Sequence, residues 1–203
     1  MKTTSLPVIL FLAILLVSVA CDGQKKNSEE NNVTAPAITA DSAANSATNN
    51  EQAMKYHEKL MEHFSADWME RESDPDLYPV YYGGSFIDNS GTFVIAVTGN
   101  QEENRQKLSV ILGGDDFKVE TVQYSYRQMM QVMDKIDAFL ADNTISQEHP
   151  VLVHFAGAYP DVMDNRVKVI LTTMDQAVIS AFKKDISDSP LLVFEQGERP
   201  SLM

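Results

Sequence analysis

The stretch that decides the fold reads YGGSFID at residues 82–88, NSG at 89–91 and TFVIAVT at 92–98. Two runs rich in aromatic and β-branched residues flank a turn-forming cluster that ends in glycine, which is the pattern of a β-hairpin. In the second run Phe93, Ile95 and Val97 recur at every second position, so one face of that strand is predicted to be buried.

The same pattern returns later in the chain, as FAGAYPD at residues 155–161 and RVKVILT at 166–172. With one gap in the turn, Gly84 aligns with Gly157, and the inward alternation of the second strand recurs as well. Its members are Val167, Val169 and Leu171. A unit that recurs in this way predicts an internal duplication.

Each hairpin is followed by a predicted helix whose start has the spacing of a capping box, and a third such start lies between the repeats. The pairs are Asn100 with Glu103, Thr173 with Gln176, and Ser125 with Gln128. The alternating segment FKVETV at 117–122 and the apolar run LLVF at 191–194 then predict a closing strand for each unit.

Before the first hairpin, an apolar stripe predicts one more helix. Its members are Met54, Leu60, Met61, Phe64 and Trp68. The predicted fold is therefore α+β: an N-terminal helix, then two ββαβ units at about residues 79–124 and 150–196, joined by an amphipathic helix. Each unit is expected to be a small antiparallel sheet with a helix on one face.

The N-terminus carries an export signal. Lys2 precedes an apolar run at residues 6–17, which is shorter than the roughly 20 residues that span a bilayer. The run ends in LVSVAC at 16–21, which resembles the bacterial lipobox, although Ser18 stands where leucine is usual. The resemblance implies a signal peptide over 1–20 and a palmitate-type lipid on Cys21, holding the protein on a membrane of the bacterial cell envelope. Which side it faces stays open, and an ordinary secretory signal with a chance cysteine is the alternative.

Residues 21–50 are expected to form a disordered tether, and residues 51–203 the folded domain. Asn, Ser, Thr and Ala dominate residues 22–50, which have no aromatic residue, and such a segment cannot bury enough apolar surface to offset its ordering entropy.

Composition narrows the possible partners. The 203 residues carry a net charge of -13, which argues against nucleic acid as a partner. The single cysteine rules out an intramolecular disulfide.

No motif in the sequence predicts catalysis, a cofactor or a metal. His57 and His63 are six residues apart, whereas a zincin helix needs its two histidines four apart. The run GGSFI at 83–87 has isoleucine where a nucleophile elbow needs its second glycine. We therefore expect a non-catalytic protein that binds a protein or peptide partner.

Tyrosines gather around the first hairpin and the strand end that follows it, and aromatic residues are enriched in binding surfaces. The candidates are Tyr78, Tyr81, Tyr82, Tyr124 and Tyr126. A half-buried position at the edge of the core is the alternative for all of them.

The duplicated hairpins, with YGGSFID at 82–88 and GAYPD at 157–161, resemble the pro-region of secreted bacterial serine proteases of the α-lytic protease and streptogrisin type. The resemblance covers about residues 79–196. It implies a folding helper and inhibitor of a serine protease, with a C-terminal tail that lies in the protease cleft like a substrate.

No protease domain follows in this sequence, so we expect any protease partner to be a separate chain. The tail after the last strand contains Gly197 and Pro200, which oppose regular structure, and we expect it to be extended and free. Its candidate cleft-binding residues are Arg199, Pro200, Ser201, Leu202 and Met203.

Overall fold

The fold is seen in a computed structural model that describes the backbone of residues 40–200 and the side chains of 49–200. The predicted signal peptide over 1–20, the proposed lipid site Cys21, the tether up to residue 39 and the last residues Ser201, Leu202 and Met203 lie outside this range.

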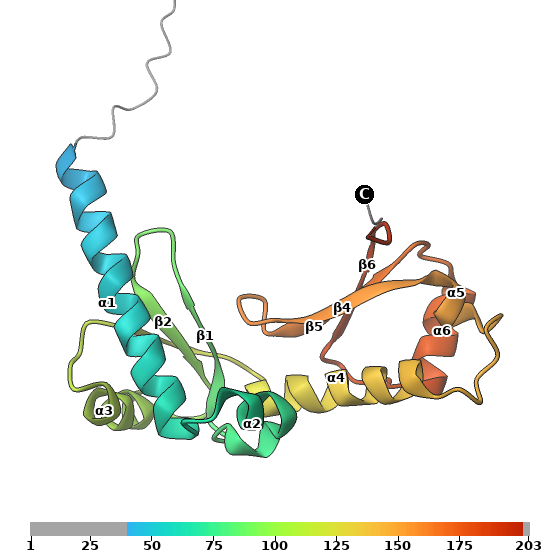
Figure 1. The fold of residues 1–203 in the computed structure, drawn as a ribbon, viewed down its shortest axis with the longest axis horizontal. Helices are drawn as coiled ribbons and strands as arrows, with labels where there is room; N and C mark the ends of the chain where they lie inside the picture. Colours follow the sequence, from blue (N-terminus) through green and yellow to red (C-terminus); the bar gives the residue numbers. More distant parts are fainter. Residues whose placement is uncertain (1–39, 201–203) are drawn as a thin grey trace, which may run out of the picture. The chain divides into compact units, whose positions relative to one another are not determined.

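The architecture is α+β, as the sequence predicts, with two ββαβ units joined by a helix (Figure 1). The first unit and the segments before it comprise α1 (Ala40–Phe64), α2 (Trp68–Ser73), the 3₁₀ turn η1 (Pro75–Leu77), β1 (Tyr82–Ile87), β2 (Phe93–Val97), α3 (Gln101–Leu112) and β3 (Lys118–Thr121). The joining helix is α4 (Tyr126–Ala141). The second unit comprises α5 (Pro150–His154), β4 (Phe155–Asp161), β5 (Arg166–Leu171), α6 (Gln176–Asp185) and β6 (Leu192–Gln196).

Each unit has a three-stranded sheet, in the orders β1-β2-β3 and β4-β5-β6. The hairpin strands pair antiparallel, but β3 runs parallel to β2 and β6 runs parallel to β5. The expectation of wholly antiparallel sheets is therefore wrong. The reason is the helix between the second and third strands, which returns the chain to the starting end of the sheet, so that the third strand runs in the same direction as the second.

Each unit has its own core. The predicted alternation is confirmed in β5, whereas β2 is buried on both faces, since Val94 and Ala96 are also covered. In the first unit Phe93, Ile95 and Val97 pack against α1 and α3. In the second, Val167, Val169 and Leu171 are completely buried in a cluster that includes residues of α4 and α6.

The first helix differs from the prediction at both ends. It begins at Ala40, so residues 40–50 of the expected tether are helical. Alanine is frequent in that segment and has the highest helix propensity, so the segment extends a helix whose later turns are held by packing.

Of the predicted stripe, Leu60 is buried, and Met61 and Phe64 pack partly buried against the same core. Met54 is half exposed, and Ala53 and Tyr56 face the core instead. Trp68 lies in the separate helix α2 with 64% of its surface exposed. The Asp67 carboxylate accepts from Met69 N and Glu70 N, so α2 starts anew at Trp68 and the chain leaves the stripe.

Two of the three predicted helix starts are confirmed. Ser125 and Gln128 form a complete capping box at α4, and Asn100 accepts from two backbone amides of α3. At α6 the cap is Asp175 and not Thr173, because the Asp175 carboxylate accepts from Ala177 N. Within residues 40–200, none of the helices is both long and apolar enough to cross a bilayer.

Candidate functional site

The five candidate tyrosines lie in the two cores or at their margins. Tyr78 and Tyr82 are 5% and 4% exposed, and their rings stack 5.8 Å apart. The ring of Tyr126 meets that of Tyr78 edge-on at 4.8 Å. Tyr81 is half-buried against the same core, and Tyr124 is half-buried against the second core. The aromatic side chains therefore build the junction between β1 and the start of α4.

Burial keeps the hydroxyl groups of this cluster neutral. Burial raises the pKa of Tyr82 far above its ordinary value of 10, although the hydrogen bond with Ser85 opposes the shift. Burial also raises the pKa of Tyr126 to about 12. Because the hydroxyls keep their protons at neutral pH, they can act both as donors and as acceptors.

Three of the five tyrosines line a cavity of about 240 Å³ at this junction. The remaining wall residues are His57 and Met61 of α1, Arg71 and Glu72 of α2, Ser85 of β1, and Val162 from the turn between β4 and β5. The cavity is thus lined by side chains of both ββαβ units.

Three polar side chains that line the cavity contact one another. Ser85 Oγ lies 2.9 Å from the Tyr82 hydroxyl oxygen and 3.5 Å from His57 Nδ1. Burial and the nearby Arg71 guanidinium lower the pKa of His57, and Glu58 opposes them. Ser85 lies within a strand, and no carboxylate of residues 49–200 forms an ion pair with His57, so the pair lacks the orienting acid of a catalytic triad.

The approach of Val162 depends on Gly84. Gly84 has φ +114°, and a Cβ atom at this position would collide with the side chain of Val162. The pairing of β1 with β2 shifts register between Tyr82 and Gly84, which marks a bulge at the same place. The equivalent glycine, Gly157, has open space around it, so the two glycines of the repeat have different roles.

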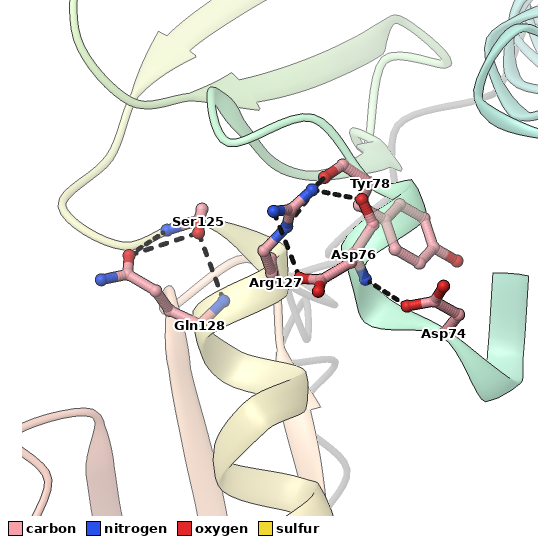
Figure 2. A network of polar contacts seen from close by, with 6 residues as sticks. All are labelled: Asp74, Asp76, Tyr78, Ser125, Arg127 and Gln128. Atoms are coloured by element: carbon pink, nitrogen blue, oxygen red, sulfur yellow. Dashed lines mark hydrogen bonds and ion pairs between the residues drawn. The ribbon is translucent and has the colours of Figure 1, made fainter.

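The start of α4 is fastened to the first unit by a polar network (Figure 2). Arg127 donates from Nε and Nη2 to the carbonyl of Tyr78, at 3.1 and 2.6 Å, and from Nη2 to the carbonyl of Asp76. It also forms an ion pair with the Asp76 carboxylate at 3.2 Å. Asp74 in turn accepts from Asp76 N at 2.9 Å, so η1 is held at both ends.

The second sheet is pinned on one face by a single cation. Lys168 Nζ lies 2.9 Å from Asp161, 2.7 Å from Asp164 and 3.3 Å from Glu195. These partners come from β4, the following turn and β6, so one ammonium group ties together all three strands. Asp164 and Asp161 raise the pKa of Lys168, while burial opposes them.

The tail does not leave this sheet freely. Gly197 N donates to Leu171 O at 2.9 Å and extends the β5–β6 pairing. Arg199 then donates to the carbonyls of Leu152 and Val153 at 2.6 Å, and to that of Phe155 at 2.9 Å. The last carbonyls of a helix lack partners within it, and the Arg199 guanidinium satisfies those of α5. The expectation of a free tail is thus not met at Arg199, while Pro200 is exposed.

Sequence reasoning missed the clamp formed by Arg127 and the docking of Arg199. Neither has a local signal, because the partners of Arg127 lie 49 to 51 residues away and those of Arg199 lie 44 to 47 residues away in the chain.

Comparison with known families divides the chain at the start of α4. Residues 41–122 match the family of the Pro-like N-terminal domain, and residues 127–197 match that of the Pro-like C-terminal domain. A comparison with curated proteins found no match. The two families meet at residues 123–126, which the tyrosine cluster and the Arg127 network hold in place.

Proposed function

Because the chain belongs to the Pro-like N-terminal and C-terminal domain families, we propose that it acts as a pro-region does, by binding a serine protease as a non-catalytic inhibitor or folding helper. The surface that meets the protease is the β6 edge together with the tail.

The observation that carries this proposal is the position of β6. It is the outer strand of the second sheet, so one side of its backbone is not paired with another strand of that sheet. Such an edge accepts an extended segment of a partner through main-chain hydrogen bonds. The Pro-like C-terminal domain ends at residue 197, directly after this strand, so the tail begins where the edge ends.

The docking of Arg199 supports a role for the tail. Three carbonyl contacts hold the guanidinium against α5 and β4, so Pro200 leaves the domain from a defined point. A segment whose first residues are already ordered loses less conformational entropy on binding, which increases its affinity. Pro200 also lacks a backbone N–H, which favours resistance to cleavage after Arg199.

The test is inhibition of trypsin-like and chymotrypsin-like bacterial serine proteases by the full chain. The protein carries Cys21→Ser, so that a lipid does not interfere. We expect inhibition at micromolar concentration, and we expect a chain that ends at Glu198 to inhibit at least tenfold more weakly. Arg199→Ala should fall between the two, because it keeps the tail but releases its start.

A matched control is Lys107→Ala, which removes an exposed cation on α3 and should inhibit like the parent. Equal inhibition by the parent and the chain ending at Glu198 would exclude the tail. No inhibition by either would leave a peptide-binding module with another partner. That partner would then be sought by crosslinking at the β6 edge.

We also propose that Cys21 carries a lipid and holds the protein on the cell envelope. The segment that follows Cys21 then joins the domain to this anchor. The lipobox-like run at 16–21 supports this. Labelled palmitate should enter the wild-type chain and not Cys21→Ala, and only the wild type should sediment with membranes. If the wild type and Cys21→Ala sediment equally and neither takes up the label, the lipid anchor is refuted.

A further inference from the structure

The cavity between α1, α2 and β1 has the composition of a small-molecule site with two opposite charges at its wall. We propose that it binds a free α-amino acid with a large apolar side chain. Arg71 takes the carboxylate, Glu72 takes the ammonium group, and Met61 and the tyrosine rings receive the side chain. This inference is independent of protease binding, since it concerns a different part of the molecule.

The two charges lie at the cavity wall, and Arg71 Nη1 also donates to the carbonyl of Ser65. Arg71 and Glu72 both line the cavity, and neither forms an ion pair with another residue of 49–200. Both lie near the hydroxyl of Tyr78, since Glu72 raises the pKa of that group and Arg71 lowers it, while burial is the largest influence and raises it. A cation and an anion near one hydroxyl match the two charges of a zwitterion.

The size of the cavity suits a ligand of about one residue. Its volume of about 240 Å³ equals that of roughly eight water molecules in the liquid. Sites for drug-sized ligands begin at about 300 Å³. One amino acid with an aromatic or branched side chain therefore fits within it.

The walls offer both the polar and the apolar contacts that an amino acid requires. The rings of Tyr78, Tyr82 and Tyr126 and the thioether of Met61 form an apolar surface. Ser85 and the Tyr82 hydroxyl, 2.9 Å apart, remain as neutral hydrogen-bonding groups. The lining mixes polar and apolar groups, with polar surface slightly in excess. Placed polar groups of this kind fix the orientation of a ligand in its site.

Val162 gives the ligand contacts with both Pro-like domains. It belongs to the turn between β4 and β5, and it completes a wall otherwise made by residues of the first unit and α4. A ligand that contacts both domains stabilises the folded chain, so binding should raise the melting temperature.

The experiment is calorimetric titration of the full chain, carrying Cys21→Ser, with L-phenylalanine and L-leucine. Both should bind, and each should raise the melting temperature. L-phenylalaninamide lacks the carboxylate, and N-acetyl-L-phenylalanine lacks the ammonium group. Each should bind about tenfold more weakly or worse, because each loses a hydrogen-bonded charge.

Variants assign the two charges. Arg71→Gln should weaken L-phenylalanine about tenfold but leave L-phenylalaninamide unchanged, since the amide has nothing for Arg71 to pair with. Glu72→Gln should likewise affect L-phenylalanine and not the N-acetyl compound. Glu102→Gln, an exposed carboxylate on α3, is the control and should bind as the parent does.

The site is refuted if L-phenylalanine at about 10 mM gives neither heat nor a shift in melting temperature. It is also refuted if the charged and blocked ligands bind alike, or if Arg71→Gln weakens all of them equally. Circular dichroism of each variant separates loss of fold from loss of the site. Protease inhibition by the same samples is read separately, so the two proposals succeed or fail independently.

Discussion

The side-chain amide of Asn165 pairs with both backbone polar groups of Tyr124, although the two residues are 41 positions apart. Asn165 Oδ1 accepts from Tyr124 N at 2.8 Å, and its Nδ2 donates to Tyr124 O at 2.8 Å. The same oxygen accepts from Gln123 N at 3.1 Å. Asn165 is buried and has φ +53°, so the turn between β4 and β5 fixes the segment that joins the two Pro-like domains.

Replacement of Asn165 should therefore destabilise the domain. Asn165→Ala removes three hydrogen bonds and leaves backbone groups without partners, and we expect a loss of about 2–4 kcal/mol in the free energy of unfolding. Asn165→Gly loses the same bonds but tolerates the positive φ, so it should be about 1 kcal/mol less harmful. Urea unfolding of the two variants measures both effects. Equal stability of Asn165→Ala and wild type would contradict the clamp.

The Arg127 network should depend on the shape of the guanidinium more than on its charge. Arg127→Lys keeps the charge, but a single ammonium group cannot reproduce the fork at the Tyr78 and Asp76 carbonyls. We expect a loss of about 1–2 kcal/mol in thermal or urea unfolding. Asp76→Asn removes only an exposed ion pair and should cost about 0.5 kcal/mol or less. A larger loss of stability in Asp76→Asn than in Arg127→Lys would show that the charge of Arg127 matters more than its shape.

His57 should make the stability of the domain depend on pH. Burial and Arg71 lower its pKa in the folded state below the ordinary value of 6.5, with Glu58 opposing. The unfolded chain then takes up the proton first. The contribution of neutral His57 is complete above pH 6.5, and it is lost as the pH falls through the lowered pKa.

The measurement is the urea midpoint between pH 8 and pH 5. The fall of the urea midpoint below pH 6.5 should be smaller in His57→Gln than in the wild type. His63→Gln is the control, because His63 lies exposed near the end of the same helix. A decline that stays the same in His57→Gln would mean that other groups produce it.

Lys168 should matter most where its three carboxylate partners are ionised. In Lys168→Met the carboxylates of Asp161, Asp164 and Glu195 face one another without a cation, so the melting temperature should fall at pH 7. Burial raises the pKa of Asp161, but hydrogen bonds from Asp164 N and Lys168 lower it overall. The stabilisation they provide is therefore present at neutral pH and is lost as the pH falls through that lowered value.

The difference in melting temperature between Lys168→Met and the wild type should thus become smaller toward pH 3. Lys183→Met removes an exposed partner of Asp188 and serves as the matched control, with little change at either pH. A difference that does not vary with pH would mean that Lys168 acts through packing of its aliphatic chain.

Local patterns account for the parts of the fold that were predicted well. The strands β1, β2, β4 and β5 follow from alternation around turn clusters, and the cap of α4 follows from Ser125 and Gln128. These features are set by residues close together in the chain, so the sequence shows them directly. The parallel direction of β3 and β6 was missed because it depends on where the preceding helix returns the chain.

The candidate site was predicted less well, for the same physical reason. Sequence alone identified Tyr78, Tyr82 and Tyr126 as a group, but not that their rings would be buried against one another. The sequence identified Arg199 as part of the tail but did not predict its carbonyl partners on α5.

By itself, then, the sequence determined the duplicated ββαβ order, the amphipathic faces and the resemblance to a pro-region, because each depends on the local period of apolar and turn residues. Only the tertiary structure decided that Arg71, Glu72 and Val162 share one cavity and that Asn165 holds Tyr124. Contacts between residues tens of positions apart arise when the units pack, and no local pattern encodes them.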